Sequence, residues 1–454
     1  MVGTHINRNI TWAEQGQPFM TYLARNSFML QQGLFVADFA YLLNEGAPST
    51  MPFWGEGLKP APPEGYDFDY VNSDVVLNRT SVNAEGRIVL PGGMSYSVLV
   101  LPEVNRMTLP VITKIRRLVL DGATVLGPKP LQSPSLTGYP NADSDVRSIA
   151  NEVWGDLDGI SRTKRKVGKG TVVWGLSPTD VIASMNIPKD VEYTRSLDSH
   201  VSWIHRRAGD ADIYFFANNT DRKQDINVRF RVTGKEAELW HADTGEIEPG
   251  EFSIVDGRTT VPLHLAERES VFVVFRRPTT SPTRTLARST ETTLATVDGP
   301  WIVDFPPNFG APPNITLPKL ESWTVNADEG VKYFSGTAIY TKSVNVDRRW
   351  LRAGHKVLLN LGTVNDLVEV SVNGKPLGLL WKAPYEVDVT SALKSGANHL
   401  EIKVTNEWTN RLIGDRLTPG KRVLPEGPPP FGPPPALNIS GLLGPVTFVS
   451  FSLR

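Results

Sequence analysis

Five side chains within the first fifteen residues could together hold a polyol. A sugar presents many hydroxyl groups and an apolar ring face, so a pocket for it needs bidentate donors and acceptors beside an aromatic ring. The sequence offers that combination in His5, Arg8, Asn9, Trp12 and Glu14. The same residue types would also suit a loop that leads into a helix and caps it. The segment therefore predicts either a sugar-contacting wall or a capped loop.

Three acids in the first fifty residues are candidates for glycoside hydrolysis, which needs two carboxyl groups on either side of the bond. Asp38 lies inside an apolar run, where a structural, hydrogen-bonded carboxylate is expected. Glu14 and Glu45 remain as a formal pair, but nothing in the sequence fixes the distance between them. The residue pattern therefore assigns no catalytic residue.

Metal and nucleotide motifs have no specific form in this chain. The seven histidines are scattered, and no HExxH motif or EF-hand loop occurs. His200 and His205 lie in a β-rich region, which is typical of ordinary strand residues rather than metal ligands. A calcium ion bound by carboxylate and carbonyl oxygens needs no fixed spacing, so the sequence leaves it open. Nucleotide binding has no support, because no GxGxxG spacing is present.

The elements that must position these side chains begin with a helix. Residues 19–32 carry apolar side chains at helical spacing, and the run 34–43 is almost continuously apolar, as in a strand buried on both faces. Further on, the pattern predicts a strand at 95–103, a helix at 108–122 and a strand at 123–128. A strand, a crossover helix and a strand indicate a parallel pair in an α/β domain.

The pattern of apolar residues changes along the chain, from continuous runs to short alternating ones. This change predicts a multidomain protein with an α/β region followed by all-β regions. We expect the α/β domain at 34–193 and an all-β module of short alternating strands at 194–277. Residues 278–299 are rich in Ser, Thr and Pro and are typical of a linker. Residues 300–454 predict a β-sandwich of jelly-roll type.

Within the expected sandwich, the alternating run that ends at Asn373–Gly374 predicts a β-hairpin, because this dipeptide favours a two-residue turn. The proline-rich stretch 425–435 predicts a stiff surface excursion. Trp381 and Trp408 could be platforms for a ligand, but each flanks a strand of alternating core residues, which favours core or interface anchors.

Bulk properties narrow the class of partner. The 454 residues carry 47 Lys and Arg against 48 Asp and Glu, so no net positive field attracts nucleic acid or an anionic membrane. The absence of cysteine excludes disulfides and a cysteine nucleophile. No run of about 20 apolar residues and no signal-peptide pattern occurs, so we expect a soluble chain of undecided compartment.

Two groups of motifs, at opposite ends of the chain, resemble glycoside hydrolase family 106, the α-L-rhamnosidase-like enzymes. Near the N-terminus they are GTHINRNITWAEQ and YLARNSFMLQQGLFVADFAYLLNEGAP, and near the C-terminus FSGTAIYTKSV and LNLGTVNDLVEVSVNGKPLGLLW. The C-terminal group looks like the galactose-binding-like sandwich of many glycosidases. The resemblance implies that residues 1–33 end a (β/α)₈ barrel and that a flavodoxin-like or amidotransferase-like domain follows.

The resemblance also implies a function. Enzymes of this family hydrolyse terminal α-L-rhamnosyl linkages with inversion, bind the sugar with calcium, and are often secreted or periplasmic. His5, Arg8, Asn9, Trp12 and Glu14 would then line the sugar pocket, since barrel active sites lie at the carboxyl ends of the strands. By the same analogy Asn406, Asn410, Arg411 and Asp415 could face that pocket.

A (β/α)₈ barrel needs about 250 residues, far more than the 33 that precede the α/β region. We therefore expect the catalytic carboxyl groups upstream of Met1, and rhamnose-containing glycans as partners of a largely non-catalytic part. The amidotransferase-like domain cannot act as a glutaminase without a cysteine. The alternative is a carbohydrate-binding or structural accessory protein without catalytic activity.

Overall fold

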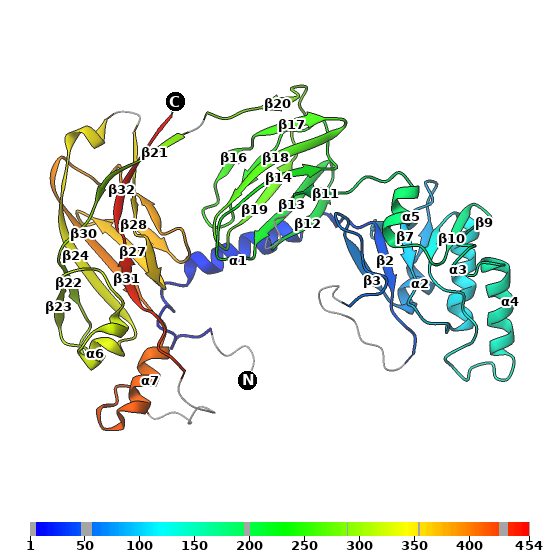
Figure 1. Cartoon of the computed structure of the whole chain (residues 1–454), viewed down its shortest axis with the longest axis horizontal. Coiled ribbons are helices and arrows are strands. Elements are labelled where there is room, and N and C mark those ends of the chain that lie inside the picture. Colours follow the sequence, from blue (N-terminus) through cyan, green and yellow to red (C-terminus); the bar gives the residue numbers. More distant parts are fainter. Residues whose placement is uncertain are drawn as a thin grey trace.

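The computed structural model describes residues 6–46, 57–194, 200–287, 289–352, 355–425 and 435–453. Figure 1 shows an α/β domain at one end of the long axis, a β module in the middle and a second β-sandwich at the other end. Helix α1 (Gln17–Leu30) runs beside the β module toward the second sandwich. Within the described ranges, no helix is both long and apolar enough to span a bilayer.

The α/β domain is built on a six-stranded sheet in the order β3-β2-β7-β8-β10-β9, in which only the edge strand β9 is antiparallel. Successive apolar residues of the parallel strands enter two different apolar clusters, so this part of the sheet is buried on both faces. Helices α2, α3 and α4 cover one face and α5 covers the other. The main sheet and its helices comprise β2 (Phe39–Leu42), β3 (Phe68–Val71), α2 (Ser73–Arg79), β7 (Val98–Val100), α3 (Leu109–Asp121), β8 (Thr124–Leu126), α4 (Ala142–Trp154), β9 (Lys164–Val167), β10 (Gly170–Val173) and α5 (Pro178–Ser184); a small sheet adds β4 (Ser81–Val82), β5 (Ile88–Val89) and β6 (Ser95–Tyr96).

The predicted unit of strand, crossover helix and strand is confirmed, because β7 and β8 pair in parallel and α3 connects them. The predicted single strand at 34–43 is wrong, since the run divides at Asp38. Its first part, β1 (Leu34–Phe35), pairs with a strand of the β module, and only its second part, β2, joins the parallel sheet. A buried carboxylate needs hydrogen-bond partners, and Asp38 has them where the α/β domain meets the β module.

The β module consists of two packed antiparallel sheets, β1-β12-β13-β19-β15-β16 and β11-β14-β18-β17-β20. Their inner faces enclose an aromatic core that includes Tyr214, Phe216, Phe230 and Phe275. The strands are β11 (Val191–Tyr193), β12 (Val201–Ala208), β13 (Ala211–Asn218), β14 (Gln224–Phe230), β15 (Glu238–Trp240), β16 (Ile247–Pro249), β17 (Phe252–Val255), β18 (Arg258–Leu265), β19 (Ser270–Phe275) and β20 (Thr283–Arg284).

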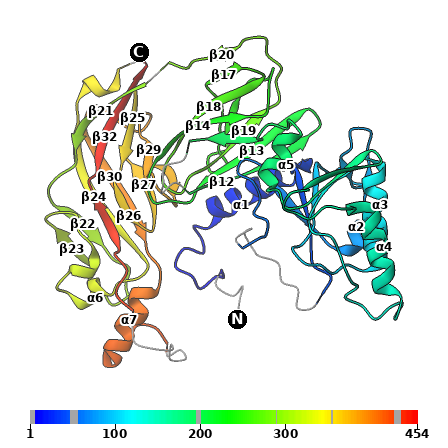
Figure 2. The ribbon, with the colours of Figure 1, turned by 45° about the vertical axis from the view of Figure 1, so that its right-hand side comes forward.

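Helix α1 covers the outer face of the first of these sheets. Met29 packs with Ile213 and Phe272 in a separate apolar cluster, and the Tyr22 hydroxyl lies 2.8 Å from the Ser270 hydroxyl. The helix was expected at 19–32 and is observed two residues earlier, with a proline in its first turn. The views in Figures 1 and 2 agree that α1 extends from the β module to the second sandwich.

The second sandwich pairs a sheet β23-β22-β24-β30-β27-β28 with a sheet β21-β32-β25-β29, and β26 and β31 form an additional pair. Trp301, Trp323 and Tyr340 are fully buried between the sheets. Its elements are β21 (Ser289–Thr296), β22 (Trp301–Asp304), β23 (Asn314–Leu317), η1 (Trp323–Val325), α6 (Glu329–Lys332), β24 (Thr337–Val346), η2 (Arg348–Leu351), β25 (Lys356–Asn360), β26 (Thr363–Asn365), β27 (Leu367–Val372), β28 (Lys375–Leu380), β29 (Glu386–Asp388), β30 (Gly396–Thr405), α7 (Thr409–Leu417), η3 (Pro419–Lys421), β31 (Gly441–Gly444) and β32 (Thr447–Leu453).

Two further predictions concern this half of the chain. The hairpin is confirmed: β27 and β28 pair across Asn373 and Gly374, which both have positive φ, of 55° and 78°. The linker at 278–299 is wrong, because β20 pairs with β17 and β21 forms a long ladder with β32. Threonines in this segment suit an edge strand once a partner strand is available. Of the proline-rich excursion 425–435, residues 426–434 lie outside the described residues.

Candidate functional site

A cavity of about 790 Å³ lies between the N-terminal segment and the second sandwich. Its volume is in the range of small-molecule sites. We call it the Trp408 cavity, after the aromatic residue that joins its two walls. It is lined by Arg8, Asn9, Ile10, Thr11, Pro306, Phe309, Gly336, Thr337, Trp408, Leu412, Leu424 and Pro425.

Trp408 connects the two walls directly. Its indole N–H donates a hydrogen bond of 2.6 Å to the backbone oxygen of Asn9. Its ring lies nearly parallel to that of Phe309, with the centroids 6.0 Å apart and an interplanar angle of 7°. Because both rings are only partly buried, the cavity has an aromatic surface that a ligand can reach. Trp408 occupies this position because it immediately precedes α7 at the end of β30.

The structure divides the five predicted N-terminal residues. Arg8 and Asn9 are exposed and line the Trp408 cavity, where a guanidinium and an amide lie beside the aromatic surface. Trp12 and Glu14 do not belong to its lining. The ring of Trp12 packs edge-on against Phe19 of α1, with the centroids 6.2 Å apart, and Glu14 is exposed in the turn before the helix. His5 lies outside the described residues.

Trp381 and Trp408 take different roles. Trp381 contacts Phe19 and Tyr22 of α1, at centroid distances of 5.3 and 5.1 Å, and is therefore an interface anchor as expected. Trp408 makes an interface contact through its N–H and also lines a cavity. Sequence reasoning missed Phe309, whose only signal is an aromatic residue in a loop rich in proline and glycine.

The polar group near the C-terminus was expected to face the catalytic pocket. None of its four residues lines the Trp408 cavity, although Arg411 lines a smaller cavity of about 370 Å³. Asn406, Asn410, Arg411 and Asp415 are all at most 3% exposed. Asn406 bonds the backbone before β24, and Asn410 bonds the backbone and a serine before β31. The Asp415 carboxylate lies 3.0 Å from the Arg411 Nε and accepts the backbone N–H of Leu424, at 2.9 Å. These groups hold α7 and the loop whose residue Leu424 lines the cavity.

Two of the three N-terminal acids, Glu45 and Asp38, form hydrogen bonds that stabilise the fold. Both carboxylate oxygens of Glu45 accept hydrogen bonds from Thr108, at 2.9 Å from the backbone N–H and 2.7 Å from the hydroxyl, so Glu45 caps α3. Asp38 is buried and bonds Ser97 and Arg231, which confirms the structural carboxylate expected there. Arg8 is the one ionisable group among the described residues that line the Trp408 cavity.

His205 belongs to a buried charged array. Its Nδ1 lies 2.7 Å from Asp190 and its Nε2 lies 3.2 Å from Asp212, and its ring stacks on Tyr214. Burial lowers the pKa of His205, but the hydrogen bonds to the two carboxylates outweigh that effect and raise the pKa above its usual value. Because both ring nitrogens face carboxylates, His205 is an imidazolium that donates to each.

The calcium ion implied by the family resemblance finds no matching ligand set here. Among the described residues, no group of three or more His, Asp or Glu side chains is arranged so that it could hold a metal ion. Hard cations such as calcium require several oxygen ligands, usually with more than one carboxylate. We therefore assign no metal ligand within the described part of the chain.

Comparison with known proteins gives consistent results. A family model described as alpha-L-rhamnosidase, of glycoside hydrolase family 106, matches residues 1–254, and one described as glycosyl hydrolase 2 galactose-binding domain-like matches residues 323–422. The structure is similar to that of a rhamnosidase from Novosphingobium sp. PP1Y, with a TM-score of 0.87 and 37% identity over 99% of this chain and 42% of the other.

A curated relative from Formosa agariphila, named a putative beta-glucuronidase, is 26% identical over 92% of this chain and 53% of its own length. The chain thus spans about half the length of the curated relative it matches. The family model covers more than half of the 454 residues, and the similar structure covers nearly all of them. This chain therefore belongs to the α-L-rhamnosidases of glycoside hydrolase family 106.

Proposed function

We propose that this chain is part of an α-L-rhamnosidase that hydrolyses terminal α-L-rhamnosyl linkages, and that the Trp408 cavity contacts the sugar. Family membership supports the reaction class. The observation that carries the role of the cavity is the meeting of an aromatic surface, a guanidinium and an amide in one hollow of suitable volume.

The chemistry of the sugar matches these groups. Rhamnose is a 6-deoxy sugar, so it combines hydroxyl groups with a methyl group and an apolar ring face. Trp408 and Phe309 offer apolar surface for the methyl group and ring face. Arg8 offers donors, and the side-chain amide of Asn9 offers a donor and an acceptor, for the hydroxyl groups.

Hydrolysis needs more than this cavity provides. An inverting enzyme uses one carboxyl group as the acid and another as the base. Arg8 is a cation, and the described lining of the cavity includes no carboxyl group. We therefore assign this chain a binding and supporting role, with the two catalytic carboxyl groups outside its described residues.

The domain scheme belongs to the same proposal. Residues 1–33 would close a (β/α)₈ barrel, as the resemblance to the family implies. Strands β2 to β10, with their helices, would form the flavodoxin-like or amidotransferase-like domain expected at 34–193, whereas β1 and β11 at the ends of that range pair with strands of the β module. Numbered along the chain, the five parallel strands of the α/β domain lie in the order 2-1-3-4-5, which is the flavodoxin-like order. The all-β module expected at 194–277 would also include β1, β11 and β20, and the galactose-binding-like sandwich would follow.

A carbohydrate-binding accessory protein without catalytic activity is the second candidate. The described lining of the Trp408 cavity, which contains no carboxyl group, is compatible with this candidate too, because binding alone needs none. The two candidates predict the same binding of rhamnose by this chain. They differ in whether the complete protein hydrolyses an aryl α-L-rhamnoside.

Calorimetric titration of this chain with L-rhamnose tests the cavity. We expect Trp408→Ala to weaken binding about tenfold, or about 1.4 kcal/mol, because it removes the aromatic surface. Trp12→Ala is the matched control, since its ring faces Phe19, and it should leave the affinity within about twofold of the parent value. Equal losses in both variants, or no binding by the parent chain at millimolar sugar, would contradict the assignment.

Release of nitrophenol from an aryl α-L-rhamnoside tests the catalytic assignment. The chain alone should show no turnover above background, whereas the complete protein should hydrolyse the substrate. Turnover by the chain alone, on the order of a few per second, would show that both carboxyl groups lie within it. Inactivity of the complete protein on rhamnosides, with binding retained, would favour the accessory role.

A further inference from the structure

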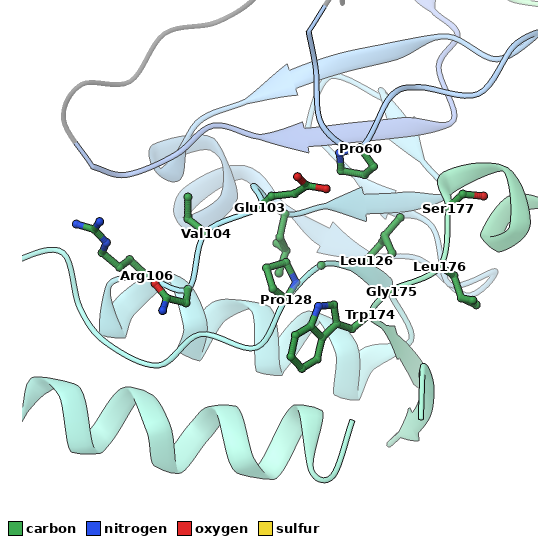
Figure 3. A pocket seen from close by; sticks show the side chains of 13 residues that line it. Pro60, Glu103, Val104, Arg106, Leu126, Pro128, Trp174, Gly175, Leu176 and Ser177 are labelled. Carbon is green, nitrogen blue, oxygen red and sulfur yellow. The ribbon is translucent and has the colours of Figure 1, made fainter. Parts of the chain in front are cut away.

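A second cavity, of about 690 Å³, lies in the α/β domain, far from the Trp408 cavity along the molecule. It opens between the loops that follow β7, β8 and β10 (Figure 3). In this view Glu103 and Trp174 lie on opposite sides, and Arg106 and Ser177 lie at opposite ends. Its lining consists of Pro60, Leu101, Glu103, Val104, Asn105, Arg106, Leu126, Gly127, Pro128, Trp174, Gly175, Leu176 and Ser177.

The position of this cavity in the sheet is one at which ligands bind. All three strands run in parallel and end at the same edge, so their following loops gather there. The strand order reverses between β2 and β7, because β3 lies on one side of β2 and the later strands lie on the other, so β7 borders both the reversal and the cavity. Open α/β sheets bind ligands in the crevice outside the carboxyl ends of their strands, near such a reversal.

Trp174 is held as a rigid platform. Its backbone N–H donates to the oxygen of Thr163, at 2.9 Å, and its side chain packs against the core of the domain. Gly159, with φ of +72°, lies directly against the indole. A Cβ at position 159 would come within 2.8 Å of the ring, so only glycine permits this close packing. The remaining accessible surface of the ring contributes to the cavity.

Polar groups of both kinds surround this platform. Glu103, Asn105 and Arg106 are exposed and follow β7 within one loop. Within the described part of the chain, the side chains of Glu103 and Arg106 make no hydrogen bond or ion pair. A carboxylate and a guanidinium without partners can accept from and donate to the hydroxyl groups of a ligand.

The surroundings disfavour a phosphate-bearing ligand. A phosphate is usually bound at the N-terminus of a helix that starts directly after the strand. After β8, the next helix begins only at Ala142, and the short helix after β10 is capped by Ser177, whose hydroxyl bonds Asp180 at 2.6 Å. Glu103 and Arg106 give the lining one charge of each sign, so it has no net positive charge that would select a phosphate.

From this geometry we propose that the cavity at Trp174 is a second carbohydrate site, which binds a neutral pyranose unit separately from the Trp408 cavity. The sugar ring packs on the indole of Trp174, Glu103 accepts hydrogen bonds from its hydroxyl groups, and Arg106 donates to its oxygens. The site goes beyond the proposed function, because it requires no part of the rhamnosidase pocket. It would let the protein hold a glycan chain at two points.

The test uses the full chain with Trp408→Ala, so that binding at the first cavity is already weakened about tenfold and a further change reports on the second cavity. L-rhamnose, D-galactose and D-glucose are titrated separately by calorimetry, and inorganic phosphate and flavin mononucleotide serve as charged probes. We expect at least one sugar to bind with millimolar affinity. Adding Glu103→Gln should weaken that binding about fivefold or more, and adding Trp174→Ala about tenfold. Glu267→Gln, an exposed glutamate of the β module, is the matched control and should change nothing.

The outcomes separate this site from the first one. If Trp174→Ala does not fold, as judged by circular dichroism, Glu103→Gln decides, because its side chain is exposed. The proposal is overturned if no sugar binds the Trp408→Ala chain, if the Glu103→Gln change leaves sugar binding as it was, or if only the phosphate-bearing probes bind. Failure of the Trp408 cavity would instead appear in the parent chain, as sugar binding that Trp408→Ala does not affect.

Discussion

The β module contacts its two neighbours through different chemistry. Toward the α/β domain it presents buried charges: Asp38 of the α/β side bonds Arg231 at 2.9 Å, and His205 lies between Asp190 and Asp212. The three aspartates and His205 are almost completely buried. Such groups stabilise a contact only while every partner is present and correctly protonated.

Toward α1 and the second sandwich the contact is mainly aromatic. Phe19 and Tyr22 of α1 pack on Trp381 of the sandwich, and Tyr22 also reaches a serine of the β module. Among the described residues, one ion pair, between Asp243 and Lys382 at 2.8 Å, joins the module to the sandwich directly. Aromatic packing does not depend on protonation, so this contact should respond to lost surface rather than to pH.

Removing Asp38 should have the largest effect. Asp38→Ala leaves Arg231 and Arg87 without their shared carboxylate at a buried position, and we expect a loss of about 3–5 kcal/mol in the free energy of unfolding. Calorimetry should show the loss in the transition of the α/β domain and the β module. Asp298→Ala, at an exposed position, should change stability by less than about 0.5 kcal/mol. A loss below about 1 kcal/mol for Asp38→Ala would show that these charges do not hold the contact.

Trp381→Ala should come next. Truncating a buried tryptophan costs about 3–5 kcal/mol, and because Trp381 is only partly buried we expect about 2–3 kcal/mol. The loss should appear in the unfolding of the second sandwich and should be the same at pH 6 and pH 9. Trp381→Phe keeps much of the aromatic contact and should recover part of the stability. A loss that varies with pH would remove the distinction between the two contacts.

Raising the pH should weaken the charged contact gradually. The folded pKa of His205 lies above its unfolded value, so its stabilising effect is fully present below about pH 6.5 and is lost as the pH rises through the folded pKa. Burial also raises the pKa of Asp67 to about 7. The protonated form of Asp67 therefore stabilises the folded state at low pH, and this effect is lost as the pH rises to about 7. Above pH 7 we expect the free energy of unfolding to fall by at most about 1.4 kcal/mol per pH unit.

Denaturant unfolding from pH 7 to pH 10 measures this slope. His205→Gln should remove the part of the slope that depends on His205, at the cost of lower stability at pH 7. His264→Gln is the matched control, since His264 is exposed and, in the part of the chain that the structure describes, pairs with the equally exposed Asp225. An unchanged slope in His205→Gln would show that the imidazolium is not the group that titrates.

The sequence predicted correctly those elements that depend on neighbouring residues in the chain. The turn at Asn373–Gly374 depends on the backbone freedom of two adjacent residues, and the unit of β7, α3 and β8 depends on apolar periodicity. The run at 34–43 was misjudged, because an apolar strand pattern does not show that Asp38 ends one pairing and starts another. The linker was misjudged because composition cannot show that β32 offers β21 a free edge.

The candidate site shows the same limit. Residue type alone selected Arg8 and Asn9, since hydroxyl-rich ligands need such donors and acceptors. Chain proximity also placed Trp12 in that group, but the turn before α1 directs its ring toward Phe19. The aromatic residue that does line the cavity, Trp408, lies 399 positions from Asn9, and a hydrogen bond brings the two together.

The sequence by itself determined the kinds of chemistry available to this protein: sugar-contacting residue types, no cysteine nucleophile, and an α/β region followed by β-rich regions. Only the tertiary structure decided which of those side chains share a cavity and which serve as anchors, caps or buried charges. The physical reason is that a side chain's role depends on its burial and partners, and these come from segments hundreds of residues apart that meet only when the sheets pack.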